Sequence, residues 1–304
     1  MQTIGEQSVY RSRFGGLWTD LRNAKEIVQQ KLEEKTISST QAEQLFRWIN
    51  DGYIIIKNVA SGQMIDRLNE DTEKAWEGHF PSLHIEYWDQ NVMYVVPANP
   101  KDKWRSAKLL DLYSVSQITL EVVISPAIRD FLKVIFGRSP MAFQSLSFLR
   151  GTEQPIHQDT AYVVVSSPME VVASWIALED IEEGSGELEF YEGSHGLEEF
   201  LFQGKYKNMP HNDPDHGEYL NSLHEKAKAQ GLLKKKFIAK KGDVLIWSGD
   251  LAHGGSKILN RDKTRRSIVT HYCPHELEPG YFRYANHSEK IPWQSDAYFC
   301  YVKR

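Results

Sequence analysis

The chain has 304 residues and a formal net charge of −5, from 36 basic and 41 acidic side chains. Hydrophobic residues make up 41% of it and aromatic residues 12%, which suffices for a large core and excludes a disordered protein. Nucleic-acid binding normally needs a basic excess or a basic stripe, so we expect no nucleic-acid partner.

The cellular setting is predicted from three features. Cys273 and Cys300 form neither a CxxC pair nor a disulfide framework, which favours a reducing compartment. The first residues, MQTIGEQSVYRSRFGG, lack the apolar region of a secretory signal. No apolar run approaches the ~20 residues that cross a bilayer. We therefore expect a cytoplasmic protein without a membrane partner.

The first part of the chain, residues 1–140, is predicted to be mostly helical and to pack on a core. Helices are expected over 18–35, from Ser39 or Thr40 to Gly52, over 63–79 and over about 115–136, with Gly137 ending the last. Thr40 followed by Glu43 has the spacing of a capping box. The β-branched run YIIIKNV, residues 53–59, is typical of a strand.

The character of the sequence changes at Met141. Short β-rich runs separated by Gly or Asp follow, over residues 142–151, 161–167, 171–180, 186–194, 235–249 and 265–274. This spacing predicts a mainly β fold with flanking helices and a jelly-roll core over 141–275. We expect one catalytic domain over 1–304, with a polar insertion at 196–231 and a C-terminal tail at 276–304.

A dense basic run, Lys234-Lys235-Lys236 with Lys240-Lys241, lies in this second part. It has two interpretations. The first is a solvated surface near the start of a strand. The second is a docking patch for an anionic substrate or carrier.

Two HxD triplets offer candidate metal ligands, because both side chains can reach one ion from the end of a strand. His157-Gln158-Asp159 lies between two predicted strands, whereas His211-Asn212-Asp213 lies in a Pro-rich turn of the insertion. About one such triplet is expected by chance in a chain with this many histidines. Placement at a strand end favours His157 and Asp159, although a solvated His beside a turn Asp would read the same.

A third ligand must come from another strand. His253 follows the run VLIWSG and precedes Gly254-Gly255, where the absent side chains let backbone approach an ion or ligand. Two His and one carboxylate are the ligand set of open iron(II) oxygenase sites, which keep the remaining positions free. The alternative for His253 is a buried core histidine.

Arg265 and Ser267 begin the last predicted strand, and alternation places both side chains on one face. A guanidinium gives a two-point, charge-assisted hold on a carboxylate, which suits a dicarboxylate co-substrate. A surface arginine at a strand end is the alternative, and it fits Arg266 better.

Together these residues resemble the phytanoyl-CoA dioxygenase family over about residues 40–275. The HQDxxY motif, the Trp of the next strand, the Gly-Ser-His turn and the entry strand are matched by 157–162, Trp175, 193–195 and INDGYIIIKNV. Glu192 departs from the family, which often has Pro there. The loop before Arg265 is one residue longer than usual, which leaves Arg265 and Arg266 both open as the clamp; the distance to Tyr272 favours Arg265.

The resemblance implies a double-stranded β-helix and a dependence on Fe(II), 2-oxoglutarate and O2. It implies that His157, Asp159 and His253 bind the metal and are catalytic, and that Arg265, Ser267, Trp175 and Gln144 face the co-substrate. Trp175 could equally be plain core. The implied reaction hydroxylates a small molecule and releases succinate and CO2. Related halogenases have a small residue in place of Asp159, so its carboxylate favours hydroxylation, desaturation or ring closure.

The substrate is less evident than the reaction. Tyr162, Trp88 and Tyr94 are candidate substrate contacts, and the aromatic stretch 84–97 and the insertion 196–231 are candidate lids. The alternative is that these aromatics pack helices onto the core. The family name does not identify the substrate, and the polar insertion suggests a tailoring hydroxylase of specialised metabolism.

Two other functions compete with this interpretation. A cupin-type metalloenzyme without 2-oxoglutarate would not need Arg265 and Ser267 on one face. A non-enzymatic jelly-roll binding protein would not need an intact metal triad.

Overall fold

We describe residues 9–90, 92–280, 287–294 and 296–303 of a computed structural model of the chain. Its helices in this part are α1 (Ala24–Glu33), α2 (Ser39–Asp51), α3 (Gly62–Trp76), α4 (Gln117–Val123), α5 (Pro126–Phe136) and α6 (His216–Ala229). None of them is both long and apolar enough to span a membrane.

Local chemistry explains where the helices differ from expectation. The predicted helix over 18–35 begins only at Ala24, because Asp20 Oδ2 accepts the Leu17 N–H at 2.8 Å and closes a separate turn over 18–20. Ser38, not Thr40, caps α2 in a box with Gln41. The stretch 115–136 forms two helices, because the residue before Pro126 is driven out of helical conformation. Gly52 and Gly137 end α2 and α5 with positive φ, as predicted.

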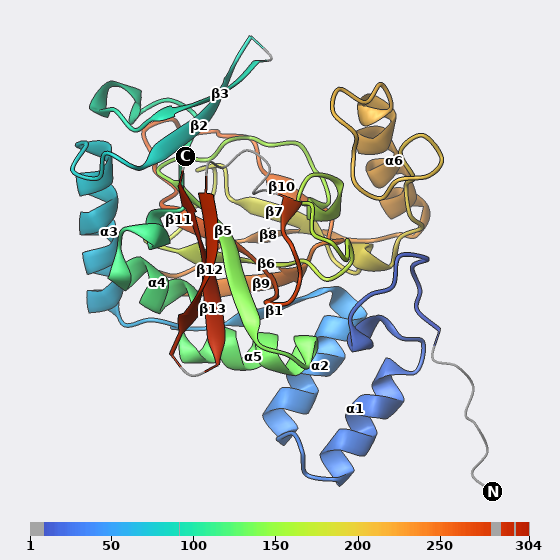
Figure 1. The fold of residues 1–304 in the computed structure, drawn as a ribbon. Helices are drawn as coiled ribbons and strands as arrows, with labels where there is room; N and C mark the ends of the chain where they lie inside the picture. Colours follow the sequence, from blue (N-terminus) through green and yellow to red (C-terminus); the bar gives the residue numbers. More distant parts are fainter. Residues whose placement is uncertain (1–8, 91, 281–286, 295, 304) are drawn as a thin grey trace, which may run out of the picture.

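Two sheets face each other and form the jelly roll (Figure 1). The large sheet has the order β1-β9-β6-β11-β5-β4-β2-β3, and the small sheet has the order β10-β7-β8. Their strands are β1 (Tyr53–Ile56), β2 (His84–Asp89), β3 (Val92–Pro97), β4 (Ala107–Leu110), β5 (Pro140–Phe148), β6 (Val172–Ala177), β7 (Leu188–Tyr191), β8 (Lys234–Phe237), β9 (Val244–Ser248), β10 (His253–Gly255) and β11 (Ser267–Pro274).

The large sheet is apolar on both faces. Its outer face packs against α2 to α5, through residues such as Ile176, Ile246 and Ile268, in the largest core cluster. Its inner face meets the small sheet in a second cluster that contains Trp175, Trp247 and Phe237. Alternation along β6, β9 and β11 therefore assigns each residue either to the helices or to the jelly-roll interior.

The large sheet also extends beyond the predicted core range. Strands β1 to β4 come from the part predicted as mostly helical, 1–140. The predicted tail, 276–304, contains a hairpin of β12 (His287–Trp293) and β13 (Ala297–Lys303), and β13 pairs in parallel with β5. The chain on either side of 141–275 thus completes one sheet.

The run AYVVVSS, residues 161–167, is not the strand that its composition predicted. After Asp159 the chain turns through 159–161, because the Asp159 carbonyl accepts the N–H groups of Tyr162 and Val163 at 2.8 and 2.7 Å. Val165 is buried and makes only an isolated bridge, to Pro279. The turn around a site residue thus overrides local strand preference.

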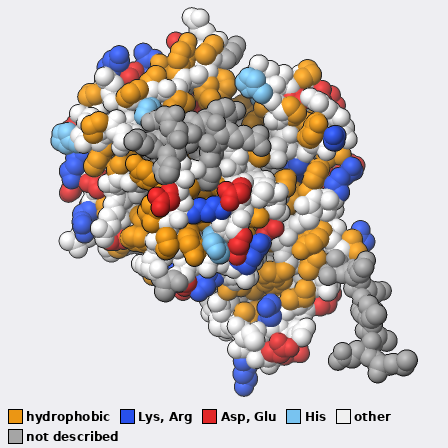
Figure 2. Space-filling model, viewed as in Figure 1, with side chains coloured by type: hydrophobic (Ala, Val, Ile, Leu, Met, Phe, Trp, Pro, Cys, Tyr) orange, Lys and Arg blue, Asp and Glu red, His pale blue; other side chains and the backbone are white. Residues whose placement is uncertain are grey.

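The basic run is neutralised by neighbouring carboxylates. Lys234 pairs with Glu189 at 2.9 Å, Lys236 with Glu187 at 2.7 Å and Lys240 with Asp180 at 2.9 Å; Lys235 and Lys241 pair with Glu192 and Asp66. On the face in Figure 2, the described acidic and basic side chains are interspersed. The first interpretation, a solvated surface, accounts for this run.

Candidate metal centre

His157, Asp159 and His253 meet at the open edge between the two sheets. The backbones of His157 and His253 exchange two hydrogen bonds of 2.9 Å, which bring their side chains together across an isolated bridge. Asp159 opens the turn that follows His157. Its Oδ1 lies 3.8 Å from His157 Nε2 and 3.7 Å from His253 Nε2. All three side chains are buried, and their ligand atoms lie within 4.8 Å of one another.

The backbone sets which imidazole nitrogen is free. His157 Nδ1 donates to the Pro155 carbonyl at 2.8 Å, and His253 Nδ1 donates to the Leu251 carbonyl at 2.9 Å. Because a carbonyl can only accept, both rings carry their proton on Nδ1 and present the Nε2 lone pair. Burial, with His253 beside it, lowers the pKa of His157 to about 3, so this ring is neutral at physiological pH.

Asp159 is held ionised in spite of its burial. Burial alone would raise its pKa, but the imidazoles of His253, His271 and His157 hold the pKa of this carboxyl below its usual range. Its second oxygen, Oδ2, accepts the indole N–H of Trp247 at 2.8 Å. The carboxylate therefore keeps one oxygen turned toward His157 and His253.

This donor set fits a divalent transition metal. Two imidazole nitrogens and one carboxylate oxygen approach from one side, which is the arrangement of an open iron(II) site. Among the described residues, Asp159 has only imidazoles, and no lysine or arginine, as basic groups beside it, so a bound cation would supply the counter-charge of this buried carboxylate. In the described part of the chain, no other group of three His, Cys, Asp or Glu side chains has this spacing.

The two glycines after His253 serve backbone packing. A side chain on Gly254 would place its Cβ 2.6 Å from the Gln154 carbonyl oxygen, and one on Gly255 would come within 3.2 Å of the Glu153 nitrogen. The predicted close approach is therefore real, but it is to the loop before His157. Glycine here lets the two ligand-bearing segments lie against each other.

Arg265 is a buried guanidinium without a paired carboxylate. It is 4% exposed; its Nη1 donates to the Gly186 carbonyl at 3.0 Å, and its Nε has no partner among the described residues. Burial lowers its pKa to about 10, which still leaves it charged, and Glu187, which acts on it electrostatically, is itself paired with Lys236 at 2.7 Å. A buried cation with a free donor fits a carboxylate-bearing ligand.

Of the other predicted co-substrate residues, Trp175 and Ser267 lie beside Arg265, whereas Gln144 lies further along the strand pair. The guanidinium carbon lies 5.3 Å from the ring centre of Phe148 and 5.9 Å from that of Trp175. Trp175 is buried against Phe237 of the small sheet, so it belongs to the core between the sheets and also lies beside the Arg265 guanidinium. Ser267 is buried, and half-buried Gln144 lies opposite His271 on the neighbouring strand.

Arg266 points to the other side of β11. Its guanidinium pairs with Glu73 of α3 at 2.7 Å, and its backbone N–H donates to Glu179 at 2.7 Å. Arg266 already has a carboxylate partner, whereas Arg265 has none in the part of the chain that the structure describes. The geometry thus favours Arg265 as the clamp.

The predicted substrate residues do not form one group. Tyr162 lies beside the triad, with its ring 5.5 Å from that of His157 and its hydroxyl hydrogen-bonded to His216 of α6 at 2.7 Å. Trp88 and Tyr94 lie on the β2–β3 hairpin, beyond β4, and are 62% and 40% exposed. They therefore do not pack helices onto the core.

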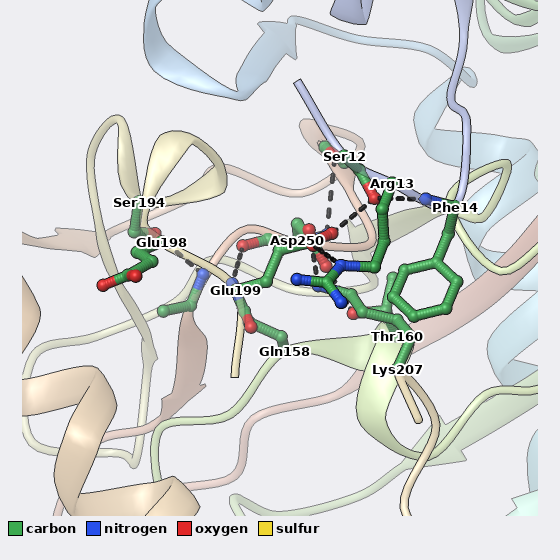
Figure 3. Close-up of polar contacts among 12 residues, drawn as sticks. Ser12, Arg13, Phe14, Gln158, Thr160, Ser194, Glu198, Glu199, Lys207 and Asp250 are labelled. Carbon is green, nitrogen blue, oxygen red and sulfur yellow. Dashed lines mark hydrogen bonds and ion pairs between the residues drawn. The ribbon is translucent and has the colours of Figure 1, made fainter. Parts of the chain in front are cut away.

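The insertion 196–231 is docked on the loop that carries the metal ligands. The Tyr219 hydroxyl accepts the N–H of Gln158, between the two ligands, at 2.8 Å. Lys207 and Asp250 form a buried ion pair of 2.8 Å, and Asp250 also accepts a hydrogen bond from Thr160 (Figure 3). These contacts hold the segments before His253 and after Asp159 against each other.

The second HxD triplet belongs to a turn of this insertion. Asn212 has a φ of 55°, and the buried Asp213 accepts the Asp215 N–H at 2.9 Å and the Gln203 side-chain amide at 2.8 Å. These bonds make it a turn-forming residue, as its Pro-rich context suggested.

Two residues at the metal centre were missed in the sequence, His271 and Trp247. His271 Nε2 lies 3.5 Å from Asp159 Oδ1, and Trp247 holds the other oxygen. The alternation that groups Arg265 with Ser267 also places His271 on the inner face, so the signal for His271 was present. Trp247 carried no such signal beyond its place in a buried strand.

The Gly-Ser-His turn has a structural role. The His195 ring packs against Gly52, where an added Cβ would lie 2.4 Å from its Nδ1, and His195 Nε2 donates to the Ile49 carbonyl at 3.2 Å. The departure at Glu192 is compensated locally, because its carboxylate accepts from the Tyr53 hydroxyl at 2.8 Å and pairs with Lys235 at 2.5 Å.

Comparison with known proteins gives one family match. The family model described as phytanoyl-CoA dioxygenase (PhyH) matches residues 48–267, more than half of the chain. No curated relative matches the chain in sequence.

Solved structures share the fold at low sequence identity. The 2-oxoglutarate-dependent carbocyclase SnoK of nogalamycin biosynthesis is 15% identical, with a TM-score of 0.58 over 80% of this chain and 86% of its own. The epimerase SnoN, in complex with Fe3+, α-ketoglutarate and nogalamycin RO, is 14% identical, with a TM-score of 0.59 over 86% and 98%. EctD from S. alaskensis, with 2-oxoglutarate and 5-hydroxyectoine, is 17% identical, with a TM-score of 0.54 over 78% and 76%.

Proposed function

The chain belongs to the phytanoyl-CoA dioxygenase family of iron(II)- and 2-oxoglutarate-dependent oxygenases, and from that premise we propose that it hydroxylates an unactivated C–H bond of a small molecule. The observation that carries this proposal is a pair of incomplete charge sites on one inner face. The ionised Asp159 has only imidazoles as basic groups beside it, and the Arg265 guanidinium lies in the same jelly roll without a carboxylate among the described residues. A metal cation would complete the site at Asp159, and a dicarboxylate would complete the site at Arg265.

Each residue has a defined task in this proposal. His157, Asp159 and His253 hold Fe(II) through Nε2, one carboxylate oxygen and Nε2. Arg265 binds the far carboxylate of 2-oxoglutarate, with Ser267 beside it on the same face. Phe148 and Trp175 stack around the guanidinium and exclude water from it. When bound, iron and 2-oxoglutarate supply the oxidising chemistry, with succinate and CO2 as by-products.

The type of reaction on the substrate follows from the carboxylate ligand, Asp159. Related halogenases have a small residue at this position, which leaves room for chloride on the metal. In this chain the carboxylate of Asp159 occupies that place. Hydroxylation is therefore the proposed outcome; desaturation and ring closure need the same groups.

The substrate proposal rests on the surroundings of the triad. Tyr162 and the Gln154 amide, which lies 3.2 Å from His157 Nε2, offer polar contacts at its edge. SnoK and SnoN belong to nogalamycin biosynthesis, which supports, for this chain, a tailoring step of specialised metabolism. Trp88 and Tyr94 would need the hairpin to approach the triad, so Tyr162 is the better candidate contact.

We further infer that residues 1–304 act as one catalytic domain in the cytoplasm. Strands from both flanks of 141–275 complete the large sheet, which supports a single unit. Both cysteines are free and buried, in keeping with a reducing compartment.

The proposal is tested by anaerobic loading with Fe(II) and 2-oxoglutarate, addition of a metabolite panel, and measurement of succinate when oxygen is admitted. Wild type should release succinate in step with a product heavier by one oxygen atom. Asp159→Ala should abolish both, because it removes the charged ligand.

Leu233→Ala is the control for this experiment, since Leu233 is 67% exposed. It should turn over as wild type does. Full turnover by Asp159→Ala, or wild-type turnover without 2-oxoglutarate, would overturn the proposal.

A further inference from the structure

A third histidine lies at the metal centre beside the two candidate ligands. His271 is 3% exposed, and its Nε2 lies 3.5 Å from Asp159 Oδ1, the oxygen that also faces His157 and His253. That distance is at the outer limit of a hydrogen bond, and neither ring nitrogen has a closer partner among the described residues. An unsatisfied buried imidazole destabilises a fold, so its place here needs an explanation.

The surroundings of His271 narrow its role. Gln144 lies opposite it on β5, and the Phe143 ring centre lies 6.2 Å from its own. Asp159 is the carboxylate it faces. The imidazole is therefore directed at the carboxylate of the metal centre from the strand that also carries Ser267.

The spacing argues against His271 as a fourth metal ligand. Its nitrogens do not join the cluster in which all ligand atoms lie within 4.8 Å of one another. Two nitrogens bound to one ion at about 2.1 Å each can be at most about 4.2 Å apart. His271 thus contacts the metal-facing oxygen of Asp159 but is not placed to bind the metal itself.

We propose that His271 is a positioning residue, which donates its Nε2–H to Asp159 Oδ1 and so orients the carboxylate that binds the metal. Trp247 donates to the other oxygen at 2.8 Å. Two donors from different strands, β9 and β11, fix both the position and the rotation of the carboxylate. One oxygen then stays turned toward His157 and His253. This inference rests on the metal site of the proposed function.

The experiment is an equilibrium titration of metal-free protein with Co(II), without 2-oxoglutarate, followed by the visible d–d absorption. His271→Leu should weaken Co(II) binding by about 10- to 100-fold, as expected for loss of a hydrogen bond to a ligand. The d–d band should also shift, because the carboxylate is free to rotate. His271→Gln, whose amide can still donate, should stay within about threefold of wild type.

Thermal unfolding of the metal-free proteins separates this role from a structural one. His271→Leu removes a contact that lies at the outer limit of a hydrogen bond, so the melting temperature of the metal-free variant should stay close to that of wild type while its Co(II) affinity falls. Phe143→Leu is the matched packing control on the same wall, and it should leave Co(II) affinity within about threefold.

The outcomes are distinct. Unchanged Co(II) affinity in His271→Leu, or equal loss in His271→Gln and His271→Leu, overturns the positioning role. A wild-type protein that binds no Co(II) or Fe(II) would instead overturn the proposed function.

Discussion

The two faces of β11 differ in how their polar groups are satisfied, although their residues alternate along one strand. On the inner face, Arg265 has no carboxylate partner and His271 has only a 3.5 Å contact with Asp159. On the outer face, Arg266 pairs with Glu73 at 2.7 Å, and the Tyr272 hydroxyl makes bonds of 2.7 Å to Val123 and 2.9 Å to Ser174.

This difference separates binding from stability within one element. Buried charges are normally paired, so the buried Arg265 guanidinium, which has no carboxylate partner among the described residues, fits a place where an anionic ligand belongs. On the outer face, Arg266 and Tyr272 anchor helices and have their polar groups paired; the Thr270 hydroxyl on the same face has no partner among the described residues, but it carries no charge. Substitutions on the inner face should therefore change ligand binding, and those on the outer face should change the free energy of unfolding.

The largest expected effect comes from the two adjacent arginines. Arg265→Leu should weaken 2-oxoglutarate binding by about 100- to 1000-fold, because charge-assisted bonds contribute roughly 1.5–3 kcal/mol each. Arg266→Leu should change it by less than about threefold, since its ion pair lies on the other face. Isothermal titration of the Mn(II)-loaded protein with 2-oxoglutarate measures both. Equal losses in the two variants would contradict the assignment of Arg265 as the clamp.

The next effect should be the reverse, a loss of stability without a loss of binding. Ile268 is fully buried on the outer face, so Ile268→Ala should lower the free energy of unfolding by about 2–4 kcal/mol. Binding of 2-oxoglutarate to the folded fraction should be unchanged. Urea unfolding with the same titration checks this, and Leu259→Ala, at a residue 73% exposed, is the control. A large loss of affinity at full stability would show that the faces are not independent.

Which residues of β11 share a face was largely predictable from the sequence, because side chains alternate between the two faces of a strand. The run RRSIVTHY placed Arg265 and Ser267 together, and the same alternation reaches His271. The HxD spacing and its placement at the end of a predicted strand identified His157 and Asp159, although the run that follows them is a turn and not a strand. Local spacing and alternation therefore supplied the metal triad and the preferred arginine.

The other features could not be predicted, because they depend on which strands pair in the sheet and on where the chain turns, and no local sequence pattern contains either. Trp247 reaches Asp159 only because of where β9 lies in the sheet. The run 161–167 has strand composition, yet the Asp159 carbonyl turns it away. The β2–β3 hairpin extends an edge of the sheet; Tyr87 packs against the core, as one interpretation predicted, whereas Trp88 and Tyr94 are exposed, and the role as a lid stays a prediction.

A smaller effect comes from His195, which packs on α2 away from the metal centre and adds to the pH dependence that His157, with its pKa lowered in the same direction, also contributes. Burial lowers the pKa of His195 to about 4, below the ordinary value of 6.5. The unfolded chain then binds more protons between these values, so stability should rise from pH 4 to pH 6.5 and be lost as pH falls. For this half-buried ring we expect about 1–2 kcal/mol across that range. His195→Leu should flatten the slope in urea unfolding at several pH values; an unchanged slope would exclude His195 as its source.

The smallest effect tests whether a satisfied polar group on the outer face behaves as an ordinary structural hydrogen bond. Tyr272→Phe removes the hydroxyl that donates to the Val123 carbonyl at 2.7 Å, while the ring stays in place. We expect a loss of about 1 kcal/mol in the free energy of unfolding, because one buried carbonyl loses its donor. Co(II) and 2-oxoglutarate affinities should stay within about threefold, since the ring lies on the side away from His271 and Arg265. If Tyr272→Phe instead weakened Co(II) binding as much as His271→Leu, the two faces of β11 would be coupled through the strand, and the division of binding from stability would fail.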